Sequence, residues 1–332
     1  MAQSLLDRKQ TEVVLNQAAN FAGYAPSIHN SQPWRWRMLP HGMQLWAVPE
    51  RHLVATDPDR RMLTISCGAA LHHALVALRA VGWTVDVHRL PDPDQPDLLA
   101  ELGSLRPHPA TDGERAMLRA LTRRWTDRRP VPGEAVPLPA LTSTMAAMSG
   151  HAVWLKLLAG DQVVEFAGIA DFASFVQDHD PTIRAELREW TSRYQMPGLG
   201  IPATARPDHQ THTVVPGRDF GAPGTLPTGG GHDHTAWYGL LCATADDPIH
   251  WLTAGEALSS GWLTAVDVGL SLVPLSWMVE TAATRAMLRQ SLCEGAQPML
   301  AVRIGCAHRV EPTDYTPRLP VVQLIERPPD PV

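Results

Sequence analysis

Charged residues, cysteines and long apolar runs are all scarce in this sequence of 332 residues. Charged residues make up 19% of the chain, below the ~25% usual in soluble domains. This indicates that folding buries much of the surface of the chain. No stretch approaches the roughly 18 apolar residues that span a bilayer, and the opening MAQSLLDRK contains no apolar signal core. We therefore expect a cytoplasmic protein with no membrane partner.

The cysteines are too few and too scattered for a disulfide framework or a structural zinc site. There are four, with no Cys-x-x-Cys: Cys67, Cys242, Cys293 and Cys306. The net charge of −6 argues against nucleic acid as the main partner. Hydrophobic residues, in contrast, are 44% of the chain, enough for a packed core. At about 150 residues per domain, the length predicts two units or one large one.

The segment Ala25–Trp34, with the sequence APSIHNSQPW, is the most informative stretch. A helix cannot run smoothly through Ala25-Pro26, because proline lacks a backbone donor and restricts the residue before it. Small polar residues follow, and Pro33 stiffens the exit before Trp34 begins a strand. This segment, the corner, offers many hydrogen-bonding groups in a small space. From the residues alone it is either a structural turn or a ligand site.

Periodicity predicts helices and strands on both sides of the corner. We expect helices at 9–24, 62–82, 112–125, 134–148, 161–194 with a break near 180, 248–269 and 281–292. We expect strands at 34–38, 45–48, 83–90, 151–158, 237–245, 298–304 and 321–325, and an apolar turn at 270–277. Residues 91–109 hold five prolines. We interpret them as a surface connection between two units, residues 1–108 and 109–332.

Two of the predicted helices carry small residues within apolar surfaces. Residues 62–82 lack a clear polar face, so this helix is expected to be buried on most sides. Its residues Cys67 to Ala70 have small side chains, so another helix can pack closely against them. The helix that begins at Asp247-Pro248, with Asp as cap and Pro at the first position, has an apolar stripe at helical spacing: Trp251, Gly255, Leu258, Trp262 and Ala265.

Four arginines lie within seven residues at positions 123–129, RRWTDRR. One interpretation is a solvated basic turn. The other is a phosphate clamp, because guanidinium groups pair bidentately with phosphate oxygens and a nearby Thr hydroxyl can complete the shell. Residues 196–235 lose all periodicity and are rich in glycine and proline. Such a long irregular segment is a lid, an inert loop or a partner-binding segment.

The pattern Ala-Pro-Ser-x-x-Asn-x-Gln-Pro-Trp resembles the flavin-binding corner of the nitroreductase family. The resemblance implies an α+β nitroreductase-like fold, with a mixed, mostly antiparallel sheet flanked by helices, and FMN as cofactor. Family members are usually homodimers in which both subunits contribute to each flavin site. Their Arg-Arg-Ser segment, however, is missing before Ala25, where Arg8-Lys9-Gln10-Thr11 stands instead.

The family's pieces are divided between the two parts of this chain. The arginine cluster comes about a hundred residues after the corner, and no second corner follows it. We infer an intramolecular pseudo-dimer, two diverged halves with one flavin site, which resembles the Acg-like branch of the family. The fused molecule is expected to be a monomer or to dimerise again.

The resemblance also assigns roles, residue by residue. It implies that Pro26, Ser27 and Asn30 contact the flavin, and that Gln32 and Trp34 frame the corner. It implies that the phosphate is contacted by Arg123, Arg124, Thr126 and Arg318. Arg318 is the best match to a late family arginine, and Arg303 is the second choice for that position. After Gly269, backbone amides would face the flavin from Leu270, Ser271 and Val273. Two departures stand out: Thr126 replaces the usual Ser, and Trp125 lies beside it.

Two functions follow from the resemblance. The first is reduction of nitro compounds or quinones by NAD(P)H through FMN, with a small aromatic acceptor and no catalytic side chain. The alternative is an FMN-sequestering or redox-sensing protein, in which residues 196–235 close the site against ordinary turnover.

A metal-dependent enzyme is a third class, because His72-His73, His209-x-x-His212 and His232-Asp233-His234 offer ligands. Adjacent histidines on a helix point in different directions, however, so no metal is expected. Cys67 lies in an apolar helix, where an inert buried thiol is expected.

Overall fold

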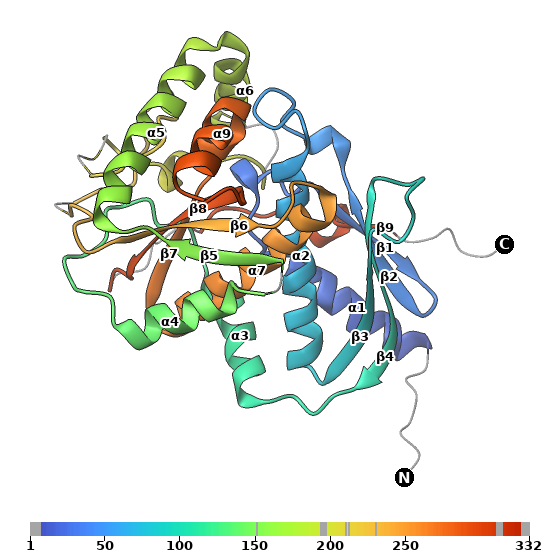
Figure 1. Ribbon diagram of the computed structural model, residues 1–332. Coiled ribbons are helices and arrows are strands. Elements are labelled where there is room, and N and C mark those ends of the chain that lie inside the picture. The colour runs from blue at the N-terminus through green and yellow to red at the C-terminus, as the bar shows by residue number, and fades with distance from the viewer. Residues whose placement is uncertain are drawn as a thin grey trace.

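The protein has an α+β fold with two sheets on either side of a central pair of helices (Figure 1). The computed structural model describes residues 8–150, 152–192, 198–209, 211, 213–229, 231–309 and 315–326. The α+β class expected from the sequence is confirmed. Each sheet has a hydrophobic core of its own, and the two cores meet where the central helices pack.

The first sheet has the strand order β3-β4-β2-β1-β9. β1 and β2, which contain the strands predicted at 34–38 and 45–48, form an antiparallel hairpin with Trp34 paired to Ala47. Side chains of β1 alternate between buried and solvated faces, and Trp34 and Trp36 are fully buried. All pairings are antiparallel except β1 with β9, which returns from the end of the chain. The bounds are β1 Trp34–Leu39, β2 Gly42–Ala47, β3 Trp83–Arg89, β4 Leu98–Pro107 and β9 Ile325–Glu326.

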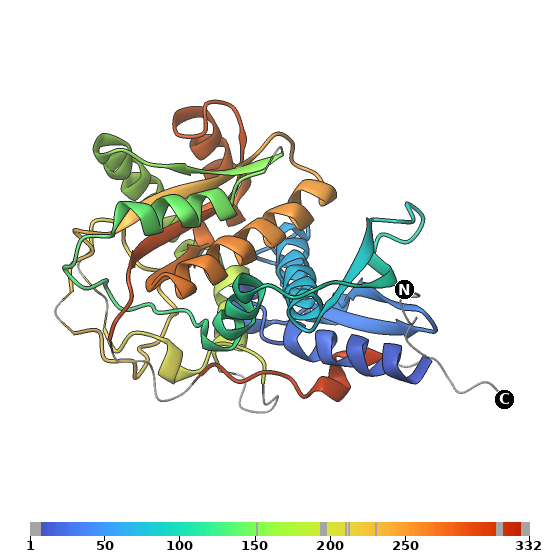
Figure 2. The ribbon, with the colours of Figure 1, turned by 90° about the horizontal axis from the view of Figure 1, so that it is seen from below.

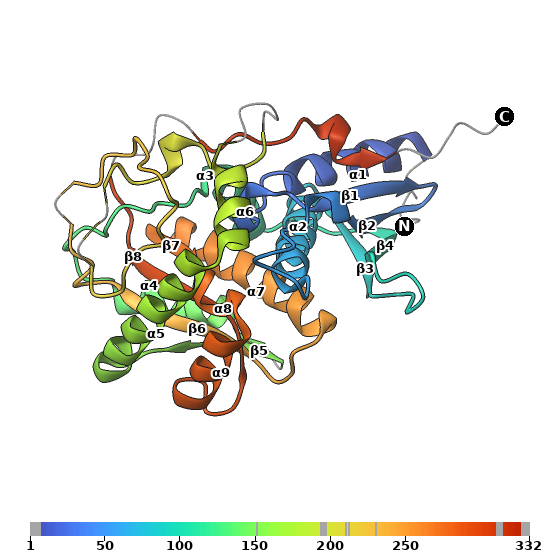
Figure 3. The same ribbon diagram turned by 90° about the horizontal axis from the view of Figure 1, so that it is seen from above.

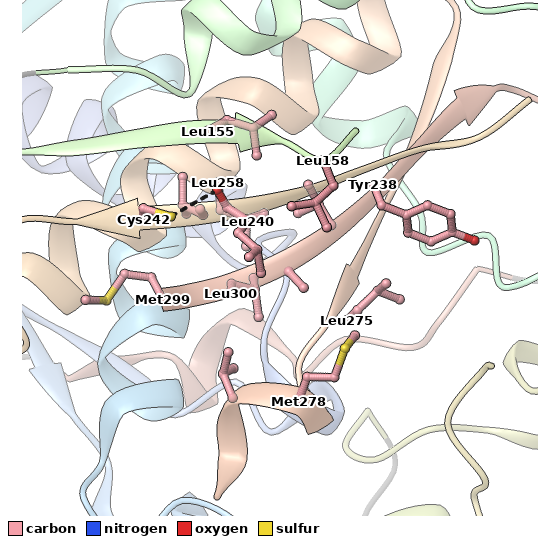
Figure 4. Packing of buried hydrophobic residues seen from close by; sticks show 14 of the residues in the cluster. Leu155, Leu158, Tyr238, Leu240, Cys242, Leu258, Leu275, Met278, Met299 and Leu300 are labelled. Atoms are coloured by element: carbon pink, nitrogen blue, oxygen red, sulfur yellow. Dashed lines mark hydrogen bonds between the residues drawn. The ribbon is translucent and has the colours of Figure 1, made fainter. Parts of the chain in front are cut away.

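The second sheet has the order β5-β6-β8-β7 and is antiparallel throughout. Its bounds are β5 Val153–Leu157, β6 Trp237–Ala243, β7 Leu270–Leu275 and β8 Gln297–Cys306. β6 and β8 are buried along most of their length, and their side chains form the core shown in Figure 4. β7 is an edge strand of this sheet, so one side of its backbone has no strand partner among the described residues.

The central helices are α2, Arg61–Ala80, and α7, Pro248–Asp267 (Figure 2). Asp57 caps α2 by accepting hydrogen bonds from the amides of Met62, at 2.9 Å, and Leu63, at 2.8 Å. The two helices cross at Gly68 and Gly255. A Cβ on Gly255 would lie 1.9 Å from the carbonyl oxygen of Ile65. The close helix contact expected near Gly68 is therefore confirmed.

Of the remaining helices, some pack on the central pair, and α8 and α9 pack on β8 of the second sheet (Figures 1 and 3). α1 packs on α2, α3 packs on α2 and α7, and α4 packs on α7. The predicted break near residue 180 is confirmed, because Asp180 and Pro181 end one helix and begin the next. The bounds are α1 Arg8–Ala22, α3 Asp112–Arg123, α4 Leu138–Ala147, α5 Gly160–His179, α6 Pro181–Thr191, α8 Trp277–Glu280 and α9 Ala282–Ser291.

Three expectations about local structure are wrong. The proline-rich stretch 91–109 contains the ten-residue strand β4, whose pairing with β2 and β3 overrides the local turn signals. Residues 270–277 are mainly strand β7 and not a turn. Most of the last predicted strand is a 3-10 turn at Val321–Gln323, so only two residues pair. The division at residue 108 stays a prediction.

By length and composition, α2 is the one helix in the described ranges that could cross a membrane. The expectation that no such segment exists needs this correction. Sixteen of its twenty residues are buried inside the protein, as expected of a core helix.

Candidate functional site

A cavity of about 480 Å³ has a volume within the roughly 300–1,000 Å³ range of small-molecule sites. The corner and one face of α2 line one side of it. The other lining residues come from the 126–128 segment, from α7, β7 and α8, and from described positions between 201 and 223 of the irregular segment 196–235. Its apolar wall includes Tyr238, Leu258, Leu275 and Leu300, labelled in Figure 4.

The corner turns sharply because three of its residues adopt left-handed backbone conformations. His29, Asn30 and Gln32 have φ values of 46°, 55° and 46°. Ser27 stabilises the turn, since its Oγ accepts a hydrogen bond from the Gln32 amide at 2.9 Å. Ser66 of α2 accepts another from the Ile28 amide at 3.1 Å. Pro26, Ser27, Ile28 and His29 line the cavity as a result.

Asn30 and Gln32 do not line the cavity and instead fix the chain around it. Asn30 Nδ2 donates to the carbonyls of Gly198, Gly200 and Pro317 at 2.9–3.2 Å. Gln32 Nε2 donates to Gly198 at 2.6 Å, and its Oε1 accepts from the Leu319 amide at 3.0 Å. The corner therefore holds the start of the irregular segment. Trp34, fully buried, anchors the corner in the first core.

The arginine cluster contributes unequally to the cavity. Thr126 and Arg128 line it. Arg123 is exposed. Arg124 is only 5% exposed and lies behind the cavity wall, with its guanidinium 4.4 Å from the ring centroid of Trp262, itself a lining residue. The solvated-turn interpretation does not describe Arg124, which is buried.

Arg124, which is buried, and Arg318, which is half-buried, form a pair of like charges that we call the inner pair. Arg124 Nη2 and Arg318 Nη2 both donate to the Tyr24 carbonyl, at 3.1 and 3.2 Å, and Arg318 Nη1 donates to Asn30 Oδ1. In the described part of the chain neither has a carboxylate partner, and Arg124 Nε and Nη1 have no hydrogen-bond acceptor. Burial, and then Arg318, lower the pKa of Arg124 well below its usual value.

Four further arginines line the cavity, and two of them come from the irregular segment. Arg206 donates from Nη1 to the Ala222 carbonyl at 3.1 Å, and Arg218 pairs with Glu280 at 2.5 Å. Arg128 donates to the Ala205 carbonyl at 2.8 Å. Burial lowers the pKa of Arg128 to about 10, with Arg218 and Arg206 adding to the shift. The same surroundings keep His29 neutral, because burial and then Arg218 and Arg128 lower its pKa.

Arg303 of β8, the second choice for the late family arginine, is the fourth. It is held by Asp233 at 2.8 Å and by the carbonyls of Asp127 and Arg129 at 2.9 and 2.8 Å. Asp233 also accepts from the Val131 amide at 2.6 Å and from the Tyr238 hydroxyl at 3.3 Å. This network joins the arginine cluster to the second sheet.

Only part of the segment after Gly269 reaches the cavity. Gly269, with φ of 79°, turns the chain from α7 into β7. Leu270 and Ser271 pair with the far end of β8 and do not line the cavity. Val273 does, together with Pro274 to Trp277. The amide contacts proposed for this segment stay a prediction.

The described residues contain no group of three or more His, Cys, Asp or Glu side chains placed to hold a metal ion. His72 and His73 instead share the hydroxyl of Ser259, each at 2.8 Å. His212 lies outside the described residues. Cys67 is fully buried, and burial raises the pKa of its thiol, which is the environment of an inert thiol.

The sequence interpretation did not single out His29, Arg128, Arg206 or Arg218 as site residues. Arg128 lay inside the predicted cluster, and His29 inside the corner, so their types and positions were available signals. Arg206 and Arg218 carried no local signal, because they lie in a segment without periodicity.

The comparisons identify the relatives of this chain. No family model matches the sequence. It is 37% identical over 92% of its length to "Putative NAD(P)H nitroreductase Rv3131" of Mycobacterium tuberculosis, of which it covers 88%. It is 32% identical over 95% of its length to "Putative NAD(P)H nitroreductase acg" of the same organism, of which it covers 96%.

Solved nitroreductase structures align with the protein more weakly. One with bound FMN, from Bacteroides fragilis, gives a TM-score of 0.36 at 14% identity and covers 60% of this chain and 94% of its own. Another with bound FMN, from Desulfitobacterium hafniense, gives 0.38 at 12%, covering 62% and 94%. From the sequence relatives, this chain belongs to the nitroreductase superfamily, in the branch that contains Acg.

Proposed function

We propose that the protein is an FMN-binding, nitroreductase-like oxidoreductase with one flavin site between its two halves. The observation that carries the proposal is the shared cavity, which joins the corner, Thr126 and β7 in one place. Each of these pieces is implied by the family resemblance, and neither half holds all of them. Two named relatives that match nearly the whole chain support NAD(P)H as the reductant.

The residues fit an anionic, aromatic cofactor. Among the described residues, several buried donors of the cavity and the inner pair have no acceptor, including Trp277 Nε1, Arg206 Nε and Arg124 Nη1. Buried polar atoms are rarely left unpaired, so a ligand rich in acceptors accounts for them. The apolar wall of the cavity would contact the isoalloxazine rings. The inner pair, which has no carboxylate partner in the described part of the chain, would bind a phosphate.

We assign the phosphate to Arg124, Thr126 and Arg318, with Arg123 as a neighbouring cation. Pro26 and Ser27 would contact the flavin from the first half, and Asn30 would support them. On the other side, backbone amides of Val273 and its neighbours would stabilise charge on the reduced cofactor. The bound flavin supplies hydride transfer, while the chain supplies orientation and electrostatics.

Many of the described residues between 201 and 223 line the cavity, which favours a lid. Arg218 ties this segment to Glu280, whose carboxylate also accepts from Ser276 at 2.8 Å and from Gln177 at 2.8 Å. A segment held this firmly supports the alternative function, an FMN-sequestering or redox-sensing protein that NAD(P)H does not reduce. We propose a cytoplasmic location, and a monomer or a dimer of pseudo-dimers.

Two measurements test these proposals. The visible spectrum of the purified protein should show oxidised flavin at one per chain. A ratio of two would contradict the single composite site, and no flavin binding would contradict the cofactor. Anaerobic addition of NADPH then separates the functions: rapid full bleaching establishes the oxidoreductase, whereas an unchanged spectrum that dithionite still bleaches establishes the sequestering protein.

A further inference from the structure

Two of the four cysteines meet in the core of the second sheet. Cys242 lies on β6, where Figure 4 labels it, and Cys293 lies in the turn between α9 and β8. The two sulfur atoms are 3.4 Å apart, and the Cys242 thiol donates to the Cys293 sulfur. Both side chains are buried. The thiols of Cys67 and Cys306 donate to backbone carbonyls instead, so this is the pair of thiols that the fold brings into contact.

Cys293 lies just beneath the surface, in a tight turn. Glu294 and Gly295 follow it with φ values of 52° and 88°, in the left-handed region that reverses the chain between α9 and β8. The Glu294 side chain is 83% exposed and pairs with Lys156 of β5 at 2.5 Å. Surface turns open locally more readily than the strands they join. A small movement of this turn would therefore admit a molecule little larger than water to the Cys293 thiol.

The two thiols differ in how readily they ionise. The hydrogen bond from Cys242 lowers the pKa of the Cys293 thiol, burial acts in the opposite direction, and the Lys156 ammonium assists the hydrogen bond. The thiolate is the nucleophilic form of cysteine, and it is also the form that oxidants attack first. Cys293 is therefore the thiol that reacts first, and Cys242, already in contact with it, is placed to resolve the product.

We propose that Cys242 and Cys293 form a redox-active pair that hydrogen peroxide converts into a disulfide. The sulfurs must approach from 3.4 Å to the ~2.05 Å of an S–S bond, a distance that rotation of the two side chains can cover. Neither residue lines the cavity, so the reaction needs neither flavin nor NAD(P)H. Where thiols are kept reduced, a disulfide of this kind is transient and records exposure to an oxidant.

The reaction has two steps. The Cys293 thiolate attacks one oxygen of the peroxide and breaks the O–O bond, which gives a sulfenic acid, while the leaving hydroxide takes up the thiol proton as water. The Cys242 sulfur then attacks the Cys293 sulfur, the S–S bond forms, and the hydroxyl group leaves with the Cys242 proton as a second water. The two thiols lose two electrons and two protons, and the peroxide takes up both.

The test uses the full chain as purified, in its folded state. The protein is reduced with dithiothreitol, separated from it, treated with a small excess of hydrogen peroxide and quenched with catalase. The remaining thiols are blocked with N-ethylmaleimide in denaturant before digestion and mass spectrometry. We expect a peptide pair that joins Cys242 to Cys293, and dithiothreitol should restore both thiols. Cys306→Ser is the matched control and should form the same cross-link, whereas Cys293→Ser should form none and keep Cys242 as a thiol.

A second measurement needs no variant and compares reduced with oxidised wild type. Because the fold already holds the two sulfurs in contact, oxidation should lower the equilibrium constant of unfolding in urea at least about tenfold, less than a typical disulfide gives. An unchanged or raised constant would overturn the pair. So would folded wild type that keeps both thiols while peroxide modifies Cys306, or one in which Cys293 is oxidised further without a cross-link. A cross-link that forms in urea but not in the folded protein would overturn it as well.

Discussion

Replacing Gly255 with alanine should destabilise the protein by separating its two central helices. In most helices this change is stabilising by ~1 kcal/mol, because glycine is a poor helix former. Here the new Cβ would lie 1.9 Å from the Ile65 carbonyl oxygen, and ordinary contact begins near 3.4 Å. The helices must therefore move apart by about 1.5 Å. The obstacle is backbone, so no side-chain rotation relieves it. Overpacking of this kind costs about 1–3 kcal/mol.

Gly168 provides the control. It lies in α5, on an exposed position, and a Cβ there meets nothing within 4 Å. Gly168→Ala should therefore raise the free energy of unfolding by up to ~1 kcal/mol, whereas Gly255→Ala should lower it. Urea titrations followed by tryptophan fluorescence measure both changes. If both variants move in the same direction, the close helix contact does not decide the outcome and the reasoning is refuted.

Three more predictions concern the cofactor, acid and thiols. Arg124→Ala should weaken FMN binding by at least ~2 kcal/mol, about 30-fold in Kd, in fluorescence titrations where the control Arg119→Ala, on the exposed face of α3, is unchanged; equal affinities would remove Arg124 from the phosphate site. Burial lowers the pKa of His72 in the folded protein to about 4. As the pH falls below about 6.5, His72 is therefore protonated in the unfolded chain but not in the folded protein. The free energy of unfolding then falls by about 1.4 kcal/mol per pH unit until the pH reaches the folded pKa. His72→Gln should flatten urea midpoints measured between pH 7 and 5, and an unaltered slope would contradict the shift. A thiol-reactive reagent should label the native protein at Cys306, the one partly exposed cysteine among the described residues. If mass spectrometry finds Cys67 labelled as fast as Cys306, the burial of Cys67 is contradicted.

The family and the corner could be predicted from sequence because their signals are local. A proline after the helix, Ser27, and the Gln-Pro-Trp exit specify a turn through short-range hydrogen bonds and restricted backbone angles. The Asp247-Pro248 start of α7 was readable for the same reason. The small residues around Gly68 likewise predicted a close helix contact.

Strand pairing was harder to predict. β4 lies in a stretch with five prolines and forms because β2 and β3 provide partners on both sides. β7 resembled a turn and became an edge strand through its pairing with β8. Hydrogen bonds between distant segments decide such elements, and no local pattern contains them.

The sequence by itself determined the family, the corner and the helices that carry each half. Only the tertiary structure decided which arginines face the cavity, because that depends on how an irregular segment folds across both halves. Arg206 and Arg218 line the cavity, and Arg123 lies in solvent, because of contacts between residues far apart in the chain. Short-range rules fix where a helix or turn begins, but the direction in which a side chain finally points is set by everything packed around it.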